Sequence, residues 1–154
     1  MAAQRILVPY NFTAYEEKAL DFVIRTYAHR DDVQLTLFNA YTPLPVVDMD
    51  ASPELTKMRG AMVSLARELK EKEAGLKAAK DFLVQNGFSD DQIDYIFKER
   101  EKAVADEIID TATKGHYRVL VLSRQPGKVS RLFARSVHNK VLISLKDVTV
   151  CIPT

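Results

Sequence analysis

Arg5-Ile6-Leu7-Val8-Pro9-Tyr10 is a near-continuous apolar run close to the N-terminus. A run of this kind is typical of a strand with both faces buried, as in a parallel sheet covered by helices. Thr13-Ala14-Tyr15-Glu16 follows with the spacing of a capping box, in which the threonine hydroxyl and the glutamate carboxylate satisfy each other's backbone amides. We therefore expect a strand that leads directly into a helix beginning near Thr13.

Four further aliphatic segments follow, separated by stretches of helical period. The expected strands are Val33–Tyr41, Ile93–Phe97, Val119–Leu122 and Val148–Ile152. The expected helices run from Thr13 to about Ala28, from Pro53 to the stop at Asn86-Gly87, from Ala105 to Ala112, and around Val137–Leu142. This alternation favours a parallel sheet, because each parallel pair needs a crossover connection. The predicted class is α/β, in a single domain over residues 1–154.

The second helix should be unusually long. An apolar stripe keeps a spacing of three or four residues, broken once at Lys72: Met58, Met62, Leu65, Leu69, Leu76, Ala79 and Leu83. We expect this stripe to pack on the sheet. Any part of it that stays exposed would mark a partner-binding face.

Composition sets limits on the kind of protein. The chain has 154 residues, 47% of them apolar and 28% charged, with a formal charge of +1, which is typical of soluble globular proteins. The N-terminal apolar run is too short for a signal peptide or a membrane span, so we expect a cytoplasmic protein without membrane contact. The single cysteine, Cys151, cannot form an internal disulfide and is expected to lie in a buried strand.

Two loops are expected to form the functional crevice. In open parallel sheets, ligands bind beyond the carboxyl ends of the strands, where the strand order reverses. The segments that follow the first and fourth expected strands are residues 10–13 and 123–136.

Several segments, in order and spacing, resemble the universal stress protein family. They are Ile6–Pro9, Leu35–Ala40, Ala105–Asp110, Val119–Leu122, Ser130–Phe133, Ser136–Leu142 and Val148–Pro153. The resemblance implies a five-stranded parallel sheet of order 3-2-1-4-5 with helices on both faces, and a homodimer through the last strand, Val148 to Ile152. A symmetric pair would cover the exposed apolar edge of that strand.

The resemblance also implies that the ATP motif is lost. ATP-binding relatives carry three spaced glycines and a serine or threonine after the fourth strand, and an aspartate at the end of the first. The glycine positions here are Leu122, Gln125 and Arg135, and Asn11 replaces the aspartate, so only Ser136 keeps the pattern. Glycine lets backbone amides approach a phosphate without a Cβ in the way. We therefore expect a non-enzymatic, homodimeric stress-response module with no cofactor, acting through an unidentified protein partner or small ligand.

A rival reading is a regulator that binds ATP, AMP or another small anion. No acidic residue stands between Thr111 and Lys146, and the basic residues in that interval could hold an anion through their side chains. The crevice residues would be Tyr10, Asn11, Ala40, Ser123, Arg124, Gln125, Arg135 and Ser136. The plainer interpretation of the basic run is a solvated surface with acidic partners such as Asp90, Asp91 and Asp94.

Other site chemistries find little support. Nucleic acid is not expected as a partner, because no aromatic platform interleaves with the basic residues. The three histidines, His29, His116 and His138, have no ligand spacing, so we expect no metal site. Ser136 and His138 stand two apart and would not face each other on a helix, so we expect no catalytic pair and interpret Ser136 as a helix cap.

Overall fold

The computed structural model describes residues 3–44, 53–123 and 139–153. Its centre is a five-stranded parallel sheet of order β3-β2-β1-β4-β5, which confirms the predicted class and strand order. The strands are β1 (Gln4–Pro9), β2 (Val33–Tyr41), β3 (Ile93–Glu99), β4 (Val119–Val121) and β5 (Thr149–Cys151). The bounds of β2 agree with those expected from the sequence.

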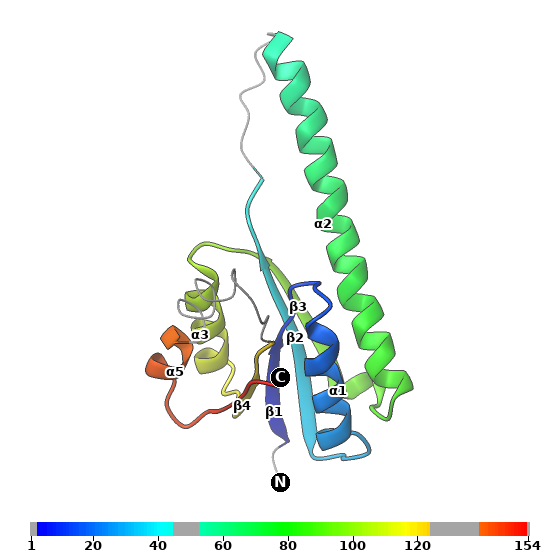
Figure 1. The fold of residues 1–154 in the computed structure, drawn as a ribbon, viewed down its shortest axis with the longest axis vertical. Helices are drawn as coiled ribbons and strands as arrows, with labels where there is room; N and C mark the ends of the chain where they lie inside the picture. Colours follow the sequence, from blue (N-terminus) through cyan, green and yellow to red (C-terminus); the bar gives the residue numbers. More distant parts are fainter. Residues whose placement is uncertain (1–2, 45–52, 124–138, 154) are drawn as a thin grey trace.

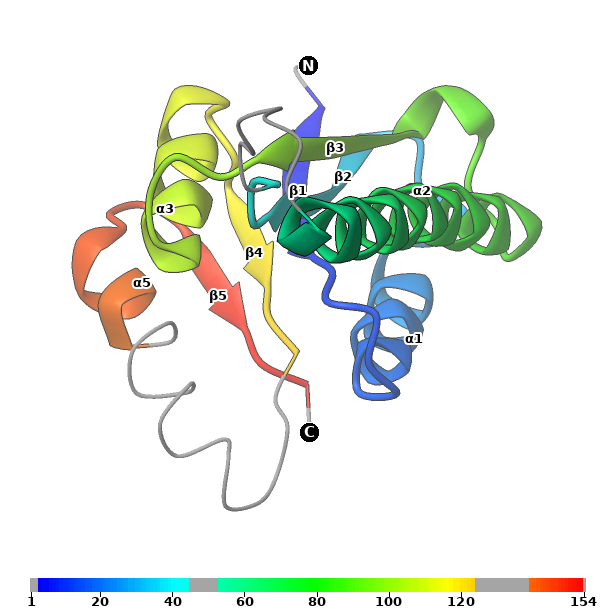
Figure 2. The same cartoon turned by 90° about the horizontal axis from the view of Figure 1, so that it is seen from above.

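Strand β1 lies at the middle of the sheet, between β2 and β4 (Figure 2). Ile6 stands opposite Leu35 on one side and Val119 on the other. The chain runs outward from β1 to β2 and β3, and then crosses back to place β4 on the other side of β1. The strand order therefore reverses between β1 and β4, so the crevice in which such sheets bind ligands is expected beyond the carboxyl ends of these two strands.

Helices cover both faces of the sheet. The helices α1 (Glu16–Tyr27) and α2 (Pro53–Gln85) lie on one face, and α3 (Val104–Lys114) and α5 (Asn139–Ser144) lie on the other (Figures 1 and 2). A short 3-10 turn, η1 (Asp90–Gln92), precedes β3. Alternate residues of β1 enter different cores: Ile6 and Val8 pack with α1 and α2, and Leu7 packs with α3 and α5. Burial on both faces explains why the strand sequence is almost continuously apolar.

The ends of the helices follow the predicted turn residues. Helix α2 begins at Pro53, and it ends two residues before Gly87, whose φ of 112° is a conformation that favours glycine. Gly115 is the C-cap of α3. The last helix was expected around Val137–Leu142. The structure places α5 at Asn139–Ser144, and residues 137 and 138 lie outside the described part of the chain.

The prediction that the apolar residues of this long helix pack on the sheet holds only for the second half of α2. Leu76, Ala79 and Leu83 are buried against the sheet, but Met58 and Leu65 are 46% and 37% exposed. The reason is length: 33 helical residues span about 50 Å, whereas a nine-residue strand spans about 30 Å. The first half of α2 projects beyond the sheet (Figure 1).

Substitutions at two adjacent residues of α2 test which face of this helix packs against the sheet. Leu83 is fully buried, and its neighbour Phe82 is 43% exposed. We expect Leu83→Ala to lower the free energy of unfolding by about 3 kcal/mol, because it leaves a cavity, and Phe82→Ala to lower it by less than about 1 kcal/mol. Urea denaturation measures the free energy of unfolding of both variants. Equal losses would contradict the packing described here.

Candidate functional site

The crevice at the carboxyl ends of β1 and β4 contains a buried carboxylate. Glu16, in the first turn of α1, is only 1% exposed. Its Oε1 accepts hydrogen bonds from the backbone amide of Asn11 at 3.2 Å and from Ser123 Oγ at 2.7 Å. Its Oε2 accepts from the backbone amide of Thr13 at 2.8 Å and from the Thr13 hydroxyl. One side chain thus connects the loop after β1, the start of α1 and the segment after β4.

The predicted capping box is confirmed in part. The Glu16 carboxylate accepts the Thr13 amide, as the pattern requires. The Thr13 hydroxyl, however, donates to the same carboxylate and accepts from the amide of Tyr15 at 3.4 Å. The Glu16 amide donates instead to the Thr13 carbonyl at 3.2 Å. A negative charge at this position also suits the positive end of the α1 dipole.

The neighbouring strand end contributes Asn39. Its Nδ2 donates to the Tyr10 carbonyl at 2.8 Å, and so fixes β2 to the segment that leaves β1. Among the described residues, Asn39 Oδ1 is the buried side-chain atom without a hydrogen-bond partner. Such an acceptor favours a donor from water or a ligand, because leaving it unpaired costs about 1–3 kcal/mol. Ala40, next in the strand, is half-buried and pairs with Lys98 of β3.

Tyr10 borders this crevice and is half-buried. Its ring packs edge-on against Phe12, with ring centroids 5.0 Å apart. Burial raises the pKa of the Tyr10 phenol above its usual value of 10.0, and the nearby charges of Glu16 and Glu17 raise it further. Burial and negative neighbours both disfavour a tyrosinate, so the phenol remains a hydrogen-bond donor at neutral pH.

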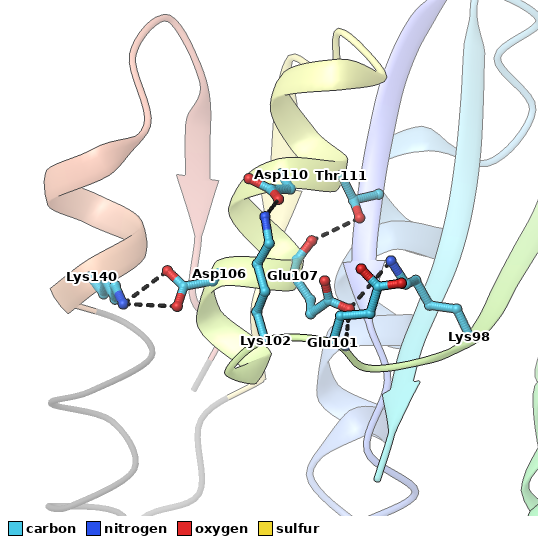
Figure 3. A network of polar contacts seen from close by, with 8 residues as sticks. All are labelled: Lys98, Glu101, Lys102, Asp106, Glu107, Asp110, Thr111 and Lys140. Atoms are coloured by element: carbon cyan, nitrogen blue, oxygen red, sulfur yellow. Dashed lines mark hydrogen bonds and ion pairs between the residues drawn. The ribbon is translucent and has the colours of Figure 1, made fainter. Parts of the chain in front are cut away.

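A second buried glutamate holds the loop after β3. Glu107, in the first turn of α3, is 2% exposed; its Oε2 lies 3.3 Å from Lys98 Nζ and accepts the amide of Glu101 at 3.4 Å (Figure 3). Ion pairs of Lys102 with Asp110 and of Lys140 with Asp106 surround it. Both loops are therefore held by a carboxylate from the helix that follows.

The first glycine position of the expected motif is part of the core. Leu122 is 3% exposed and packs in the same cluster as Leu7 and Phe38. Its amide donates to the Cys151 carbonyl at 2.8 Å, so its backbone is engaged with the last strand. Cys151 itself is half-buried beside β4, and burial raises the pKa of its thiol. A leucine that fills the core leaves no open backbone for a phosphate at this position.

The structure brings together only some of the predicted crevice residues. Tyr10, Asn11 and Ser123 lie around Glu16 and Asn39, with Ala40 one residue farther along β2. Four others lie outside the described residues: Arg124, Gln125, Arg135 and Ser136.

Among the described residues of the basic run, Lys140 has an acidic partner from elsewhere in the chain, although not one of the three aspartates named from the sequence. Lys140 pairs with Asp106 of α3 at 2.8 Å, and Asp90 pairs instead with Lys80 at 3.4 Å. Within residues 3–44, 53–123 and 139–153, no three His, Cys, Asp or Glu side chains are placed to hold a metal ion. No helix in the part of the chain that the structure describes is long and apolar enough to cross a membrane.

Sequence reasoning missed three site residues: Glu16, Asn39 and Glu107. The capping-box spacing identified Glu16, but only as a local helix signal. Its bond to Ser123 joins residues 107 positions apart, which no local pattern reveals. Glu107 stands in the first turn of a predicted helix, where an acidic residue is ordinary, and nothing in the sequence indicates its burial.

The strand order and the crossover connections place this chain in the class of parallel α/β proteins whose strand order reverses beside the first strand. The family model of the universal stress protein family matches residues 2–151, and the chain belongs to this family. No protein with a curated description matches the chain by sequence.

Solved structures share the fold at low sequence identity. Universal stress protein UspA from Lactobacillus plantarum matches with a TM-score of 0.67 and 16% identity, covering 100% of this chain and 99% of that one. A universal stress protein from Archaeoglobus fulgidus in complex with dAMP gives 0.63 and 15%, covering 100% of both chains. A universal stress protein in complex with cAMP gives 0.63 and 19%, covering 99% and 97%.

The titration of Tyr10 tests the electrostatics of the crevice. We expect Glu16→Gln to lower the pKa of Tyr10, although it stays above 10 because burial, the larger cause, remains. Since the folded-state pKa is raised, this tyrosine's contribution to stability is present below pH 10 and is lost as the pH rises through the folded value. NMR titration of ¹³C-labelled tyrosine measures the pKa. Glu17→Gln should shift it less, and an unchanged value in Glu16→Gln would refute the assignment.

Proposed function

We propose that this chain is a stress-response module of the universal stress protein family that works without stably bound ATP and without catalysis, as a single domain. The observation that carries the proposal is the Glu16 carboxylate. It already accepts the amides of Asn11 and Thr13 and the hydroxyl of Ser123, so these donors at the mouth of the crevice are not open to an external anion. The Glu16 carboxylate thus takes the place that an external anion would need in the crevice.

Electrostatics argues in the same direction. Two unit charges 4 Å apart interact by about 4 kcal/mol at an effective dielectric constant of 20. A phosphate oxygen near the amide of Thr13 would meet the buried charge of Glu16 at about this range. Tyr10 and Asn39 do not offset that charge, since one is a neutral phenol and the other a neutral amide. Leu122, at the first glycine position, adds a steric obstacle.

A second candidate function is an ATP-, AMP- or other anion-binding regulator, and two relatives favour it. One solved universal stress protein is in complex with dAMP and another with cAMP. In this chain the anion would rely on the side chains of Arg124 and Arg135 and on Ser136 rather than on a glycine cradle. A nucleotide retained through purification would establish this function in place of the first.

Nucleotide binding and the role of Glu16 are tested together. We expect the purified protein to carry no nucleotide in native mass spectrometry and to show no rise in melting temperature with millimolar ATP and magnesium. Glu16→Ala should melt lower, because it leaves buried donors unpaired at a cost of about 2–3 kcal/mol. It should gain a stabilising response to inorganic phosphate, because the freed donors accept an external anion.

Glu17→Ala is the matched control, since it removes the same charge from an exposed neighbouring position. It should show neither effect. A phosphate response in both variants would mean that net charge, rather than occupation of the crevice donors, decides anion binding. Copurified nucleotide in the wild-type protein would overturn the ATP-independent function outright.

The proposed assembly is a homodimer through the last strand. Strand β5 lies at an edge of the sheet. Thr149 donates to the Arg118 carbonyl and Cys151 accepts from Leu122, so the alternate residue Val150 turns its backbone groups toward the open edge. The preceding helix α5 adds two exposed apolar side chains, Leu142 at 50% and Ile143 at 82%. An open edge with apolar side chains beside it favours a symmetric partner.

Two variants test this edge. Val150→Lys and Ile143→Glu should each halve the mass of the assembly in light scattering at micromolar concentration, because both put a charge at the proposed contact. Ile143 is largely exposed, so its replacement leaves the core intact even if Val150→Lys folds poorly. Thr113→Glu, exposed on α3, is the control. A wild-type protein with the mass of a monomer would exclude the edge dimer.

A further inference from the structure

The projecting half of α2 carries an apolar stripe that the described chain leaves open. We call the α2 stripe its four side chains, Met58, Met62, Leu65 and Leu69. Met58 and Leu65 are 46% and 37% exposed, and the other two are half-buried. The same stripe continues down the helix as Leu76, Ala79 and Leu83, which the protein buries on its own sheet. The upper half thus repeats the pattern of the lower half without a sheet beneath it (Figure 1).

The spacing of the stripe is that of a coiled coil. From Met58 to Leu83 the steps are four, three, four, three, four, three and four residues when Lys72 is included. Steps that average 3.5 residues keep one seam facing a partner helix, whereas a helix that packs only on a sheet needs no such regularity. In the lower half the seam meets β2 and β3. In the upper half it fits a second helix.

We propose that the α2 stripe pairs with the same stripe of a second copy of this chain, in antiparallel orientation. In an antiparallel pair, Met58 lies against Leu69 of the second copy, and Met62 lies against Leu65 of the second copy. All four stripe residues are then used, and each layer joins one methionine to one leucine. Pairing a seam with itself satisfies the two-fold symmetry of most homodimers.

The length of the projecting segment fits this register. With Met62 opposite Leu65, the first helical residue of the second copy, Pro53, stands level with Ala74. Leu76 is the next stripe residue, and there the helix meets its own sheet. The paired segment of some 20 residues is about 30 Å long. The partner helix therefore ends where the body of the protein begins, and the two bodies lie at opposite ends of the pair.

Charge favours the antiparallel orientation. Between residues 57 and 67 the helix carries Lys57, Arg59 and Arg67 and no acidic residue. A parallel pair would place these basic residues beside their own copies, and like charges along a coiled coil are unfavourable. The antiparallel register instead brings Arg59 of each copy to the level of Glu68 of the other, and sets Lys57 level with Lys70.

The residues that flank the seam also allow close approach. Ala61 and Ala66 border the α2 stripe on its two sides, and a methyl side chain keeps the helix backbones from being held apart. Val63 is 62% exposed and lies outside the seam, so the pair does not need it. This contrast supplies the control for the experiment.

The α2 contact is separate from the proposed β5 edge, and the experiment keeps the two apart. In a Val150→Lys background the edge is disabled, so the association that remains reports on α2. We expect light scattering at about 100 μM to give a dimer for Val150→Lys and for Val150→Lys with Val63→Glu, and a monomer for Val150→Lys with Leu65→Glu. Circular dichroism should show the same helix content in all three, because Leu65 does not contribute to the core.

Each other outcome has a definite meaning. A monomer for Val150→Lys alone overturns the α2 pair and leaves the edge dimer in place; it is the result expected if a different protein covers the stripe. A dimer that Leu65→Glu does not dissociate also overturns the pair. If Leu65→Glu alone converts a wild-type dimer into monomers and Val150→Lys does not, the α2 pair stands and the edge dimer fails.

Cysteine cross-linking tests the orientation. In a Cys151→Ser background, a chain with both Met58→Cys and Leu69→Cys should form intermolecular disulfides in an antiparallel pair, since these positions face each other. Met58→Cys alone should not, because its copies lie at opposite ends. Efficient cross-linking of the single variant would mean a parallel pair and overturn the orientation proposed.

Discussion

The hydrogen bonds to the Glu16 carboxylate hold together the part of the molecule where the three central elements meet. The Glu16 side chain lies where β1 ends, where α1 begins and where the chain leaves β4. Each of these three segments supplies a hydrogen-bond donor to its carboxylate. A buried charge is tolerated only when its lone pairs are satisfied, so the positions of these donors are mutually dependent. The loop geometry at the crevice follows from that requirement.

The same solution occurs twice in the fold. Glu16 holds the loop before α1, and Glu107 holds the loop before α3, each from the first turn of the helix and each with almost no exposure. The N-terminal ends of helices, which carry a partial positive charge, are common binding sites for phosphate groups in α/β proteins. Here two of them are already balanced by internal carboxylates. At both helix starts the carboxylate fixes the connection that precedes the helix.

The sequence was sufficient to predict the helices and strands, but not to predict which of their side chains are buried. Strand β2 was predicted within its observed bounds, because hydrophobic pattern and turn residues are local signals. The strand order came from the resemblance, not from periodicity. The burial of a side chain depends on segments that are distant in the sequence. Glu16 is a crevice residue because Ser123, from the segment after β4, donates a hydrogen bond to it. Leu65 is exposed and Leu76 is buried because the strands are shorter than α2. Neither fact has a signal within a window of neighbouring residues.

Leu122 has a consequence for the stability of this chain. It stands where the resemblance places the first glycine of ATP-binding relatives, and its buried side chain belongs to the same core cluster as Leu7, Phe38 and Val141. Replacing it with glycine would remove a buried side chain at a cost of several kcal/mol, a large share of the stability of an ordinary domain. A glycine at this position would therefore lower the stability of the fold before it could contribute to any phosphate site.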